Sequence, residues 1–189
     1  MGTVKTTNIQ SISGSGTVTL GTSGETLAIG TGVTAGTGFG KTRQMVTTQT
    51  GAVATGTTLF PEDDTIPQNT EGDEYITLAI TPKSATSKIY ITGQVFGSFS
   101  GSTRWGIGLF KDSTADALSF TAVFTKDATS MDNGMIDYSE VSANTSARTY
   151  KIRAGGMGSA GTFTFNGQSG SRKFGGVILS TIHIIEIEV

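Results

Sequence analysis

The final seventeen residues of the chain, KFGGVILSTIHIIEIEV, constrain its fold more than any other segment. β-Branched residues dominate this segment and continue to its last position: Ile182, Ile184, Ile185, Ile187 and Val189. Such density favours a strand, and the strand needs partners on both sides or a covered face. Chain ends are usually loose unless a sheet holds them. The pattern therefore predicts a fold that its last strand completes, in a sheet buried by the same domain or by another subunit.

The two faces of this predicted strand differ in what they carry. Side chains alternate along a strand, so Ile182 and Ile184 share one face. The other face carries three apolar residues: Ile185, Ile187 and Val189. The change between Ile184 and Ile185 predicts either a bulge or burial of both faces. Glu186 and Glu188 share the parity of Ile184, and we expect them to face solvent or polar partners. The strand is thus predicted to begin in a sandwich core and to end at a subunit contact.

Charge and composition favour an all-β protein and exclude several functions. The chain has 13 Lys and Arg against 15 Asp and Glu, so it lacks the basic field that holds nucleic acid. Its 27 glycines and its many Thr and Ser residues suit short strands and tight turns but disfavour helices. Without cysteine it has neither disulfides nor thiolate metal sites. No apolar run reaches the ~18 residues of a membrane span, and the N-terminus MGTVKTTNIQ lacks the apolar core of a signal peptide. We expect no membrane insertion and synthesis in a cytoplasm.

Residues 1–56 differ from the rest of the chain and are predicted to form an attachment or trimerisation segment. They hold only four charged residues, and the sequence TVTLGT at 17–22 returns as TLAIGT at 26–31. Each copy reads as a brief strand with two apolar side chains on one face: Val18 and Leu20, then Leu27 and Ile29. Such units bury too little surface alone, so stacking against identical chains would supply their core. The alternative is a flexible leader rich in Gly, Thr and Ser.

Residues 57–189 carry a regular rhythm of strands and turns. The expected strands are 74–81, 88–98, 104–111, 119–125, 135–141, 149–154, 162–166 and 177–189. Turn signals such as Asp-Asn-Gly at 132–134 and Asn-Gly at 166–167 separate them. About eight strands at this spacing predict an antiparallel β-sandwich or jelly roll.

Residues that support catalysis or metal binding are sparse. His183 is the only histidine and lies within the last strand, where packing is its ordinary role. Acidic residues cluster at 62–64, at 71–74 and at 132–140, which leaves open a calcium site or a glycosidase pair, against the simpler reading as solvated carboxylates. The sequence predicts no metal site, no cofactor and no enzymatic activity.

Four segments resemble a domain found at the C-terminus of many tailed-bacteriophage virion proteins, often tail fibres: DDTIPQNTEGDEYITLAITPKSATSKIYI (63–91), LFKDSTADAL (109–118), YKIRAGG (150–156) and FNGQSGSRKFGGVILSTIHIIEI (165–187). The leader IQSISGSGTVTLGTSGETLAIGTGVT resembles repeats in fibres of marine and freshwater phages. The resemblance implies a homotrimeric jelly-roll head, broadly similar to the tumour-necrosis-factor and C1q type, located in the virion and released by lysis. It carries no catalytic residues. The chain departs from a typical fibre because almost no shaft separates leader and head.

These observations leave three functional hypotheses. The first is a short trimeric fibre whose head binds a bacterial surface glycan, while its leader attaches to tail, baseplate or capsid proteins. Weak sites gain from trimeric avidity, and the predicted ligand-binding residues are Arg104, Trp105, Asp132, Asn133 and Tyr138. Core packing is the default expectation for Trp105, and the functional alternative is that Trp105 and Arg104 stack on a sugar or a partner surface at an exposed edge. The second hypothesis is a capsid decoration or cement protein, and the third is a depolymerase. The predicted trimer interface comprises Val18, Leu20, Leu27, Ile29, Ile185, Ile187 and Val189.

Overall fold

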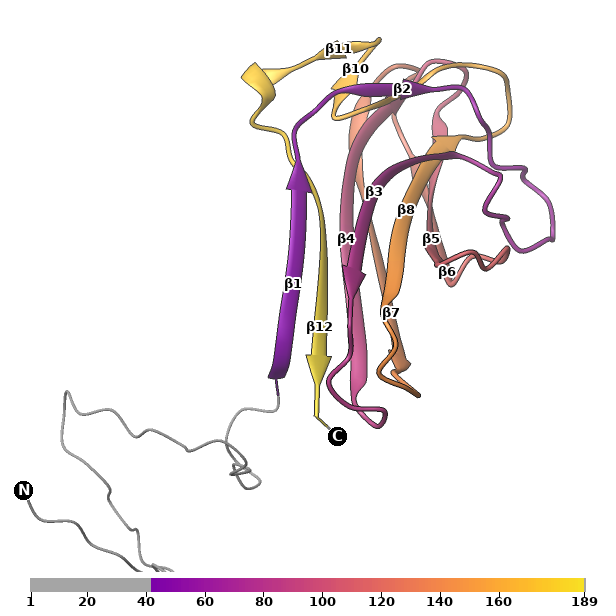
Figure 1. The fold of residues 1–189 in the computed structure, drawn as a ribbon. Helices are drawn as coiled ribbons and strands as arrows, with labels where there is room; N and C mark the ends of the chain where they lie inside the picture. The colour runs from indigo at the N-terminus through magenta and orange to yellow at the C-terminus, as the bar shows by residue number, and fades with distance from the viewer. Residues whose placement is uncertain (1–41, 189) are drawn as a thin grey trace, which may run out of the picture. The chain divides into compact units, whose positions relative to one another are not determined.

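Antiparallel pairing organises the chain into two principal sheets. The computed structural model describes residues 42–188 (Figure 1). The larger sheet contains β1 (Thr42–Thr50), β2 (Ala54–Gly56), β4 (Lys88–Phe99), β7 (Met131–Val141), β9 (Phe163–Phe165) and β12 (Ser180–Ile187). The smaller sheet contains β3 (Asp73–Ile80), β5 (Arg104–Lys111), β6 (Ser119–Phe124) and β8 (Arg148–Gly156). A hairpin of β10 (Gly167–Gln168) and β11 (Ser171–Arg172) precedes a single 3₁₀ turn, η1 (Phe174–Gly176).

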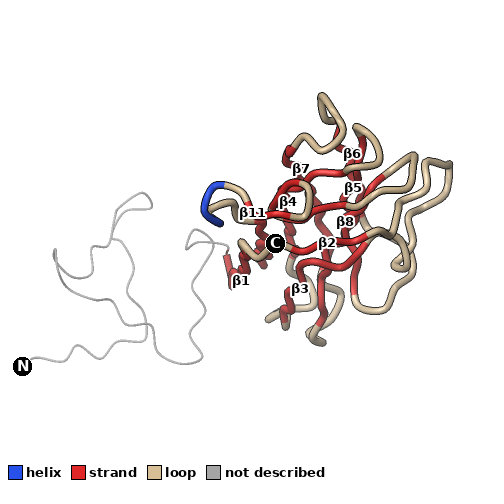
Figure 2. The backbone as a smooth tube through the Cα atoms, turned by 90° about the horizontal axis from the view of Figure 1, so that it is seen from above, coloured by secondary structure: helices blue, strands red, loops and turns tan. Residues whose placement is uncertain are grey.

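Strand β4 is the organising strand of the larger sheet. One edge pairs with β7 along nearly its whole length, from Lys88 to Ser98. The other edge pairs first with β12 and then, beyond residue 96, with β9. Strand β1 extends the sheet beyond β12, and β2 extends it beyond β9. The smaller sheet has the order β3-β8-β5-β6, and the two layers are visible in Figure 2. The predicted all-β sandwich of the jelly-roll type is confirmed.

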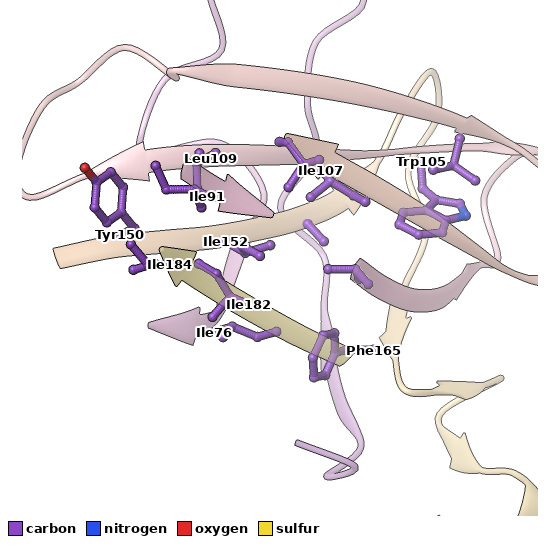
Figure 3. Close-up of a cluster of buried hydrophobic side chains, with 14 of the residues drawn as sticks. Ile76, Ile91, Trp105, Ile107, Leu109, Tyr150, Ile152, Phe165, Ile182 and Ile184 are labelled. Atoms are coloured by element: carbon purple, nitrogen blue, oxygen red, sulfur yellow. The ribbon is translucent and has the colours of Figure 1, made fainter. Parts of the chain in front are cut away.

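The core lies between the facing sides of the two sheets. Isoleucines dominate it, and both sheets contribute fully buried side chains (Figure 3): Ile91, Ile182 and Ile184 from the larger, and Trp105, Ile107, Leu109, Tyr150 and Ile152 from the smaller. Gly97 occupies an inward position of β4, where a Cβ atom would lie 2.3 Å from Cζ of Phe163. Glycine there lets the aromatic ring pack directly on the β4 backbone.

Sequence predicts most of these strands; those it misses are β1 and β2, before residue 57, and the short β10 and β11. All eight expected strands have counterparts, and most of their bounds agree within one or two residues; the last strand begins at Ser180 rather than at residue 177. However, β1 and β2 lie within the predicted leader, and the compact unit begins at Lys41. The boundary expected after residue 56 is therefore replaced by one near residue 41. The physical reason is that β1 pairs with β12 along eight residues, which makes it part of the sandwich.

Some predictions concern residues that are outside the described part of the chain. These are the interface residues Val18, Leu20, Leu27, Ile29 and Val189, together with the repeat that contains the first four. Among residues 42–188, no helix is long and apolar enough to cross a membrane.

Candidate functional site

The two sides of β12 have opposite environments, as the sequence predicts. Ile182 and Ile184 are fully buried in the core, whereas Ile185 and Ile187 are only half-buried on the outer side of the sheet. Pairing with β4 is continuous from Thr181 to Ile187, so the change of side comes from regular alternation without a bulge. Of the two predicted alternatives, the bulge is absent, and burial of both faces is met fully on the core side but only in part on the outer side.

Glu186 is fully buried and has polar partners instead of solvent. The backbone N–H of Lys83 donates to both carboxylate oxygens, at 2.8 and 2.9 Å, and that of Ser84 donates at 3.1 Å. The Ser87 hydroxyl donates at 2.5 Å and the Gln44 amide at 2.6 Å. Burial alone would raise the pKa of Glu186, but these hydrogen bonds, led by that of Ser87, hold it below its usual value. The carboxylate thereby fastens the 83–87 segment to β12 and to β1.

An apolar band crosses the outer face of the larger sheet near the C-terminal end of β12. We define it by five residues: Met45, Tyr90, Val141, Ile185 and Ile187. Met45, Ile185 and Tyr90 are direct partners on β1, β12 and β4, so their side chains share one face. Met45 and Val141 are about half exposed, at 55% and 54%. An exposed apolar band of this kind is typical of a contact surface.

Only two members of the apolar band, Ile185 and Ile187, are predicted by sequence. Met45 and Tyr90 also lie on strands in which side chains alternate between the two faces. The sequence does not show that both residues pair with Ile185, because it places β1 in the predicted leader. At the end of the sheet, Lys88 pairs with Ile187 on one side and with Val141 on the other. The missing information is the pairing of distant strands, which the order of residues along the chain does not reveal.

Polar residues and charges of both signs flank the apolar band. The next row along the sheet holds Thr47, His183, Thr92 and Asp137. The Thr47 hydroxyl and Nδ1 of His183 are 2.7 Å apart, at the exposed surface. Lys88 lies 5.9 Å from the centre of the Tyr90 ring, and Arg43 pairs with Glu188 at 2.9 Å. The rim is thus electrostatically mixed and fits a partner with the same mixture.

The structure selects core packing for Trp105 over ligand binding. Its side chain is fully buried, and its ring lies 5.1 Å from that of Phe163 in the core. It is not available to stack on a ligand, because consecutive strand residues point to opposite sides and Arg104 takes the outer one. Arg104 itself pairs with Glu62 at 2.7 Å.

The other predicted ligand-binding residues do not gather into one site. Asp132 and Asn133 are both exposed at the start of β7, but they are consecutive and so face opposite sides. Tyr138 is half-buried and packs against the core. The backbone N–H of Asn133 donates to the Asp132 carboxylate at 2.8 Å. The five residues thus belong to separate environments.

Glu140 is the centre of a charged cluster at one end of the sandwich. It accepts hydrogen bonds from Tyr150 at 2.5 Å and Lys111 at 2.7 Å, and Arg148 lies 3.3 Å away. Burial would raise the pKa of Glu140, but these two donors and the charges of Lys111 and Arg148 lower it. The pKa of Tyr150 is raised by burial and then by the neighbouring carboxylate. The cluster places one carboxylate between two cations and ties β5, β7 and β8 together.

The acidic stretch between residues 62 and 74 is also engaged by protein groups. Asp63 accepts from Thr65, and Asp73 accepts from Thr58 at 2.9 Å. Glu74 lies 3.4 Å from Lys151. Within the described residues, no three His, Cys, Asp or Glu side chains gather in a way that would hold a metal ion.

The sequence matches no known protein-family model, and no characterised protein is significantly similar to it. Structural similarity is found to a chain from the structure of infectious bursal disease virus, Gx strain, with 12% identity and a TM-score of 0.32. The match covers 78% of this chain and 37% of that one, so this chain spans well under half the length of that protein. Because identity and TM-score are both low, the functional proposal below rests on the residues of this chain.

Proposed function

We propose that this chain is a structural component of a bacteriophage particle, a short fibre whose jelly-roll heads associate as a homotrimer through the apolar band. The observation that carries the proposal is the band itself, on the outer face of β1, β12, β4 and β7. In this proposal the N-terminal segment of the chain attaches to the particle, and the jelly-roll head binds the surface of the host cell. The protein is a binding and assembly component and not an enzyme.

Partial exposure of the band is what supports association between copies. Met45 and Val141 each leave about half of their surface in water. Covering apolar area stabilises an interface by about 25 cal/mol per Å² before the costs of association. Lys88 and Asp137 lie on the same face near the band, so its rim carries both signs of charge. A second copy of the same surface can match such a rim, whereas a strongly charged partner would not.

The trimeric state and the virion setting come from the sequence resemblance. The segments 63–91, 109–118, 150–156 and 165–187 resemble phage virion heads that are homotrimeric. The all-β sandwich agrees with the fold which that resemblance implies. Charged partners occupy several of the acidic residues that would otherwise suggest hydrolysis, including Glu62, Glu74 and Glu140. This engagement supports the assignment as a non-enzymatic protein.

Light scattering during size-exclusion chromatography tests the assembly. At micromolar concentration we expect the wild-type chain to elute at three chain masses. Met45→Asp and Ile185→Lys place charges in the band and should shift the protein towards one chain mass, with the sandwich intact by circular dichroism. The control is Ala79→Lys, which changes an exposed residue of β3 on the other sheet and should leave the trimer unchanged. A wild-type chain that elutes at one chain mass would overturn the proposal.

A decoration protein on the capsid is the second candidate. The observation that favours it is the short sequence before β1, which leaves almost no room for a shaft after the Gly/Thr/Ser-rich repeat. Locating the protein in a virion reconstruction separates the candidates. Copies at the tail support a fibre, and many copies across the capsid faces support a decoration protein.

A further inference from the structure

A pocket lined by hydroxyl groups opens on the larger sheet, at the opposite end from the apolar band. Its volume is about 300 Å³, and we name it the hydroxyl pocket. Seven residues line it: Ser98, Ser100, Thr129, Thr162, Thr164, Ser169 and Gly170. Ser98 and Tyr90 lie on the same side of β4 eight residues apart, which places the pocket about 26 Å from the centre of the band. The β10–β11 hairpin marks this end of the molecule in Figure 1.

The floor of the pocket is built from paired strands. Ser98 and Thr164 are direct partners on β4 and β9, and both are almost fully buried. The Ser98 hydroxyl donates to the Gly167 carbonyl at 3.1 Å, and Thr164 accepts from the N–H of Gly170 at 3.0 Å. These bonds fix the floor to the β10–β11 hairpin, so the pocket exists before any ligand arrives.

The walls of the pocket, like its floor, are fixed by a turn and by backbone hydrogen bonds. Ser169 and Gly170 form the two-residue turn of the hairpin with φ of +50° and +74°, as in a type I′ turn. On another side, the N–H of Thr162 donates to the Ser100 hydroxyl at 2.9 Å, and the N–H of Thr129 donates to the Phe99 carbonyl at 2.8 Å. Backbone bonds thus position the hydroxyl-bearing residues and leave most of their side-chain capacity unused.

The unused hydrogen-bonding capacity defines the chemistry of the pocket. A hydroxyl offers one donor and two acceptor positions. Among residues 42–188, the hydroxyls of Thr129, Thr162 and Ser169 have no hydrogen-bond partner, and Ser100 and Thr164 each act only as acceptors. No charged side chain lines the pocket. Each lining threonine also carries a methyl group beside its hydroxyl, which suits a ligand that alternates C–H and O–H groups.

We infer that the hydroxyl pocket binds a neutral saccharide unit of a surface glycan. An anion or a metal ion would need an opposite charge, which the lining residues lack, whereas a neutral sugar matches mixed hydroxyl donors and acceptors. This inference rests on the proposed host-binding function and moves its site from Arg104 and Trp105 to the hydroxyl pocket. Single-site affinity is expected in the millimolar range, with three sites per trimer acting together.

Saturation-transfer NMR on the full chain tests the inference directly. The probes are the methyl glycosides of glucose, galactose and N-acetylglucosamine, with glucuronate as the charged comparison. We expect transfer to at least one neutral sugar and none to glucuronate. Thr129→Val and Thr162→Val each remove one hydroxyl at nearly constant shape, and each should weaken binding about fivefold. The control Thr92→Val makes the same change in the polar row of the sheet and should bind like the wild type.

Ser169→Asn provides a second test without removing a buried group. Asparagine tolerates a positive φ, and its larger side chain should narrow the pocket and reduce sugar binding while the melting temperature stays unchanged. Host-cell binding separates this inference from the proposed function. Cells bound equally by wild type and by Thr129→Val/Thr162→Val would overturn the pocket and leave the fibre standing. A wild-type trimer that binds neither cells nor any neutral sugar would overturn both.

Discussion

Ile184 and Ile185 are neighbours on one strand with the same side chain, yet they lie in different environments. Ile184 is fully buried between the sheets, while Ile185 lies half-buried in the apolar band. The difference comes only from the alternation of side chains along β12. It teaches that a single strand can supply the core with one face and a contact surface with the other. Folding and the proposed association would therefore depend on interleaved residues of the same segment.

Truncating Ile184 and Ile185 in turn is the sharpest way to break this comparison. We expect Ile184→Ala to lower the free energy of unfolding by about 3 to 4 kcal/mol, because it removes buried methyl groups and leaves a cavity. Ile185→Ala should lower it by about 1 kcal/mol or less, since part of that side chain meets water in the single chain. Urea denaturation at one fixed protein concentration measures both, because oligomer stability depends on concentration. Equal losses for the two variants would contradict the assignment of faces.

Glu186 sharpens the comparison because it is a polar residue on the core side of β12. Glu186→Gln keeps the shape but presents an NH₂ group where the Lys83 and Ser84 N–H groups and the Ser87 hydroxyl donate. We expect a loss of about 2 kcal/mol in the free energy of unfolding, from hydrogen bonds to a charged acceptor. Glu188→Gln is the matched control, because Glu188 is exposed and pairs only with Arg43 among the described residues. A larger loss for Glu188→Gln than for Glu186→Gln would contradict this role.

The sequence predicts much of β12 and less of what surrounds it. Alternation assigns Ile182 and Ile184 to one side and Ile185 to the other, and it leaves Glu186 with either solvent or polar partners. It does not reveal that those partners lie about a hundred residues away, at Lys83 and Ser87. Periodicity is a local property of the chain, and pairing between distant segments is not.

Two errors in the sequence analysis have the same physical origin. The β1 segment, TRQMVTTQT, is half polar because it is the edge strand of its sheet, so it resembles the leader that precedes it. Trp105 follows a charged residue near a predicted loop, but strand alternation takes its side chain into the core. In both cases the environment of a residue depends on tertiary neighbours that its sequence context does not identify. For the same reason, the hydroxyl pocket is assembled from four separate segments and has no sequence signature.

Acid should destabilise the fold through the core-side carboxylates. The folded-state pKa values of Glu186 and Glu140 lie below their usual value, so the unfolded chain binds more protons as pH falls from neutrality. Their stabilising effect is complete above the unfolded pKa of about 4.3 and is lost as pH falls through the folded values. Thermal unfolding between neutral pH and acid measures it.

The Glu186→Gln variant provides the control for that pH dependence. It lacks one of the two carboxylates with lowered pKa, so its stability should fall less steeply in acid than that of the wild type. The remaining slope should come largely from Glu140. A variant with the same slope as the wild type would show that Glu186 does not contribute to acid sensitivity.

Substitution of His183 tests the polar part of the outer face. Of the predicted changes in the free energy of unfolding, this one should be the smallest. Its ring contacts Thr47 at the exposed surface, at 2.7 Å. Water replaces an exposed hydrogen bond with little loss, so His183→Ala should change the free energy of unfolding by about 0.5 kcal/mol or less. His183→Gln keeps a hydrogen-bonding group and should match the wild type within error. Urea denaturation, run beside Ile184→Ala, measures both. A loss above about 2 kcal/mol for His183→Ala would mean that the outer face also supports folding, and the division between the two sides of β12 would no longer hold.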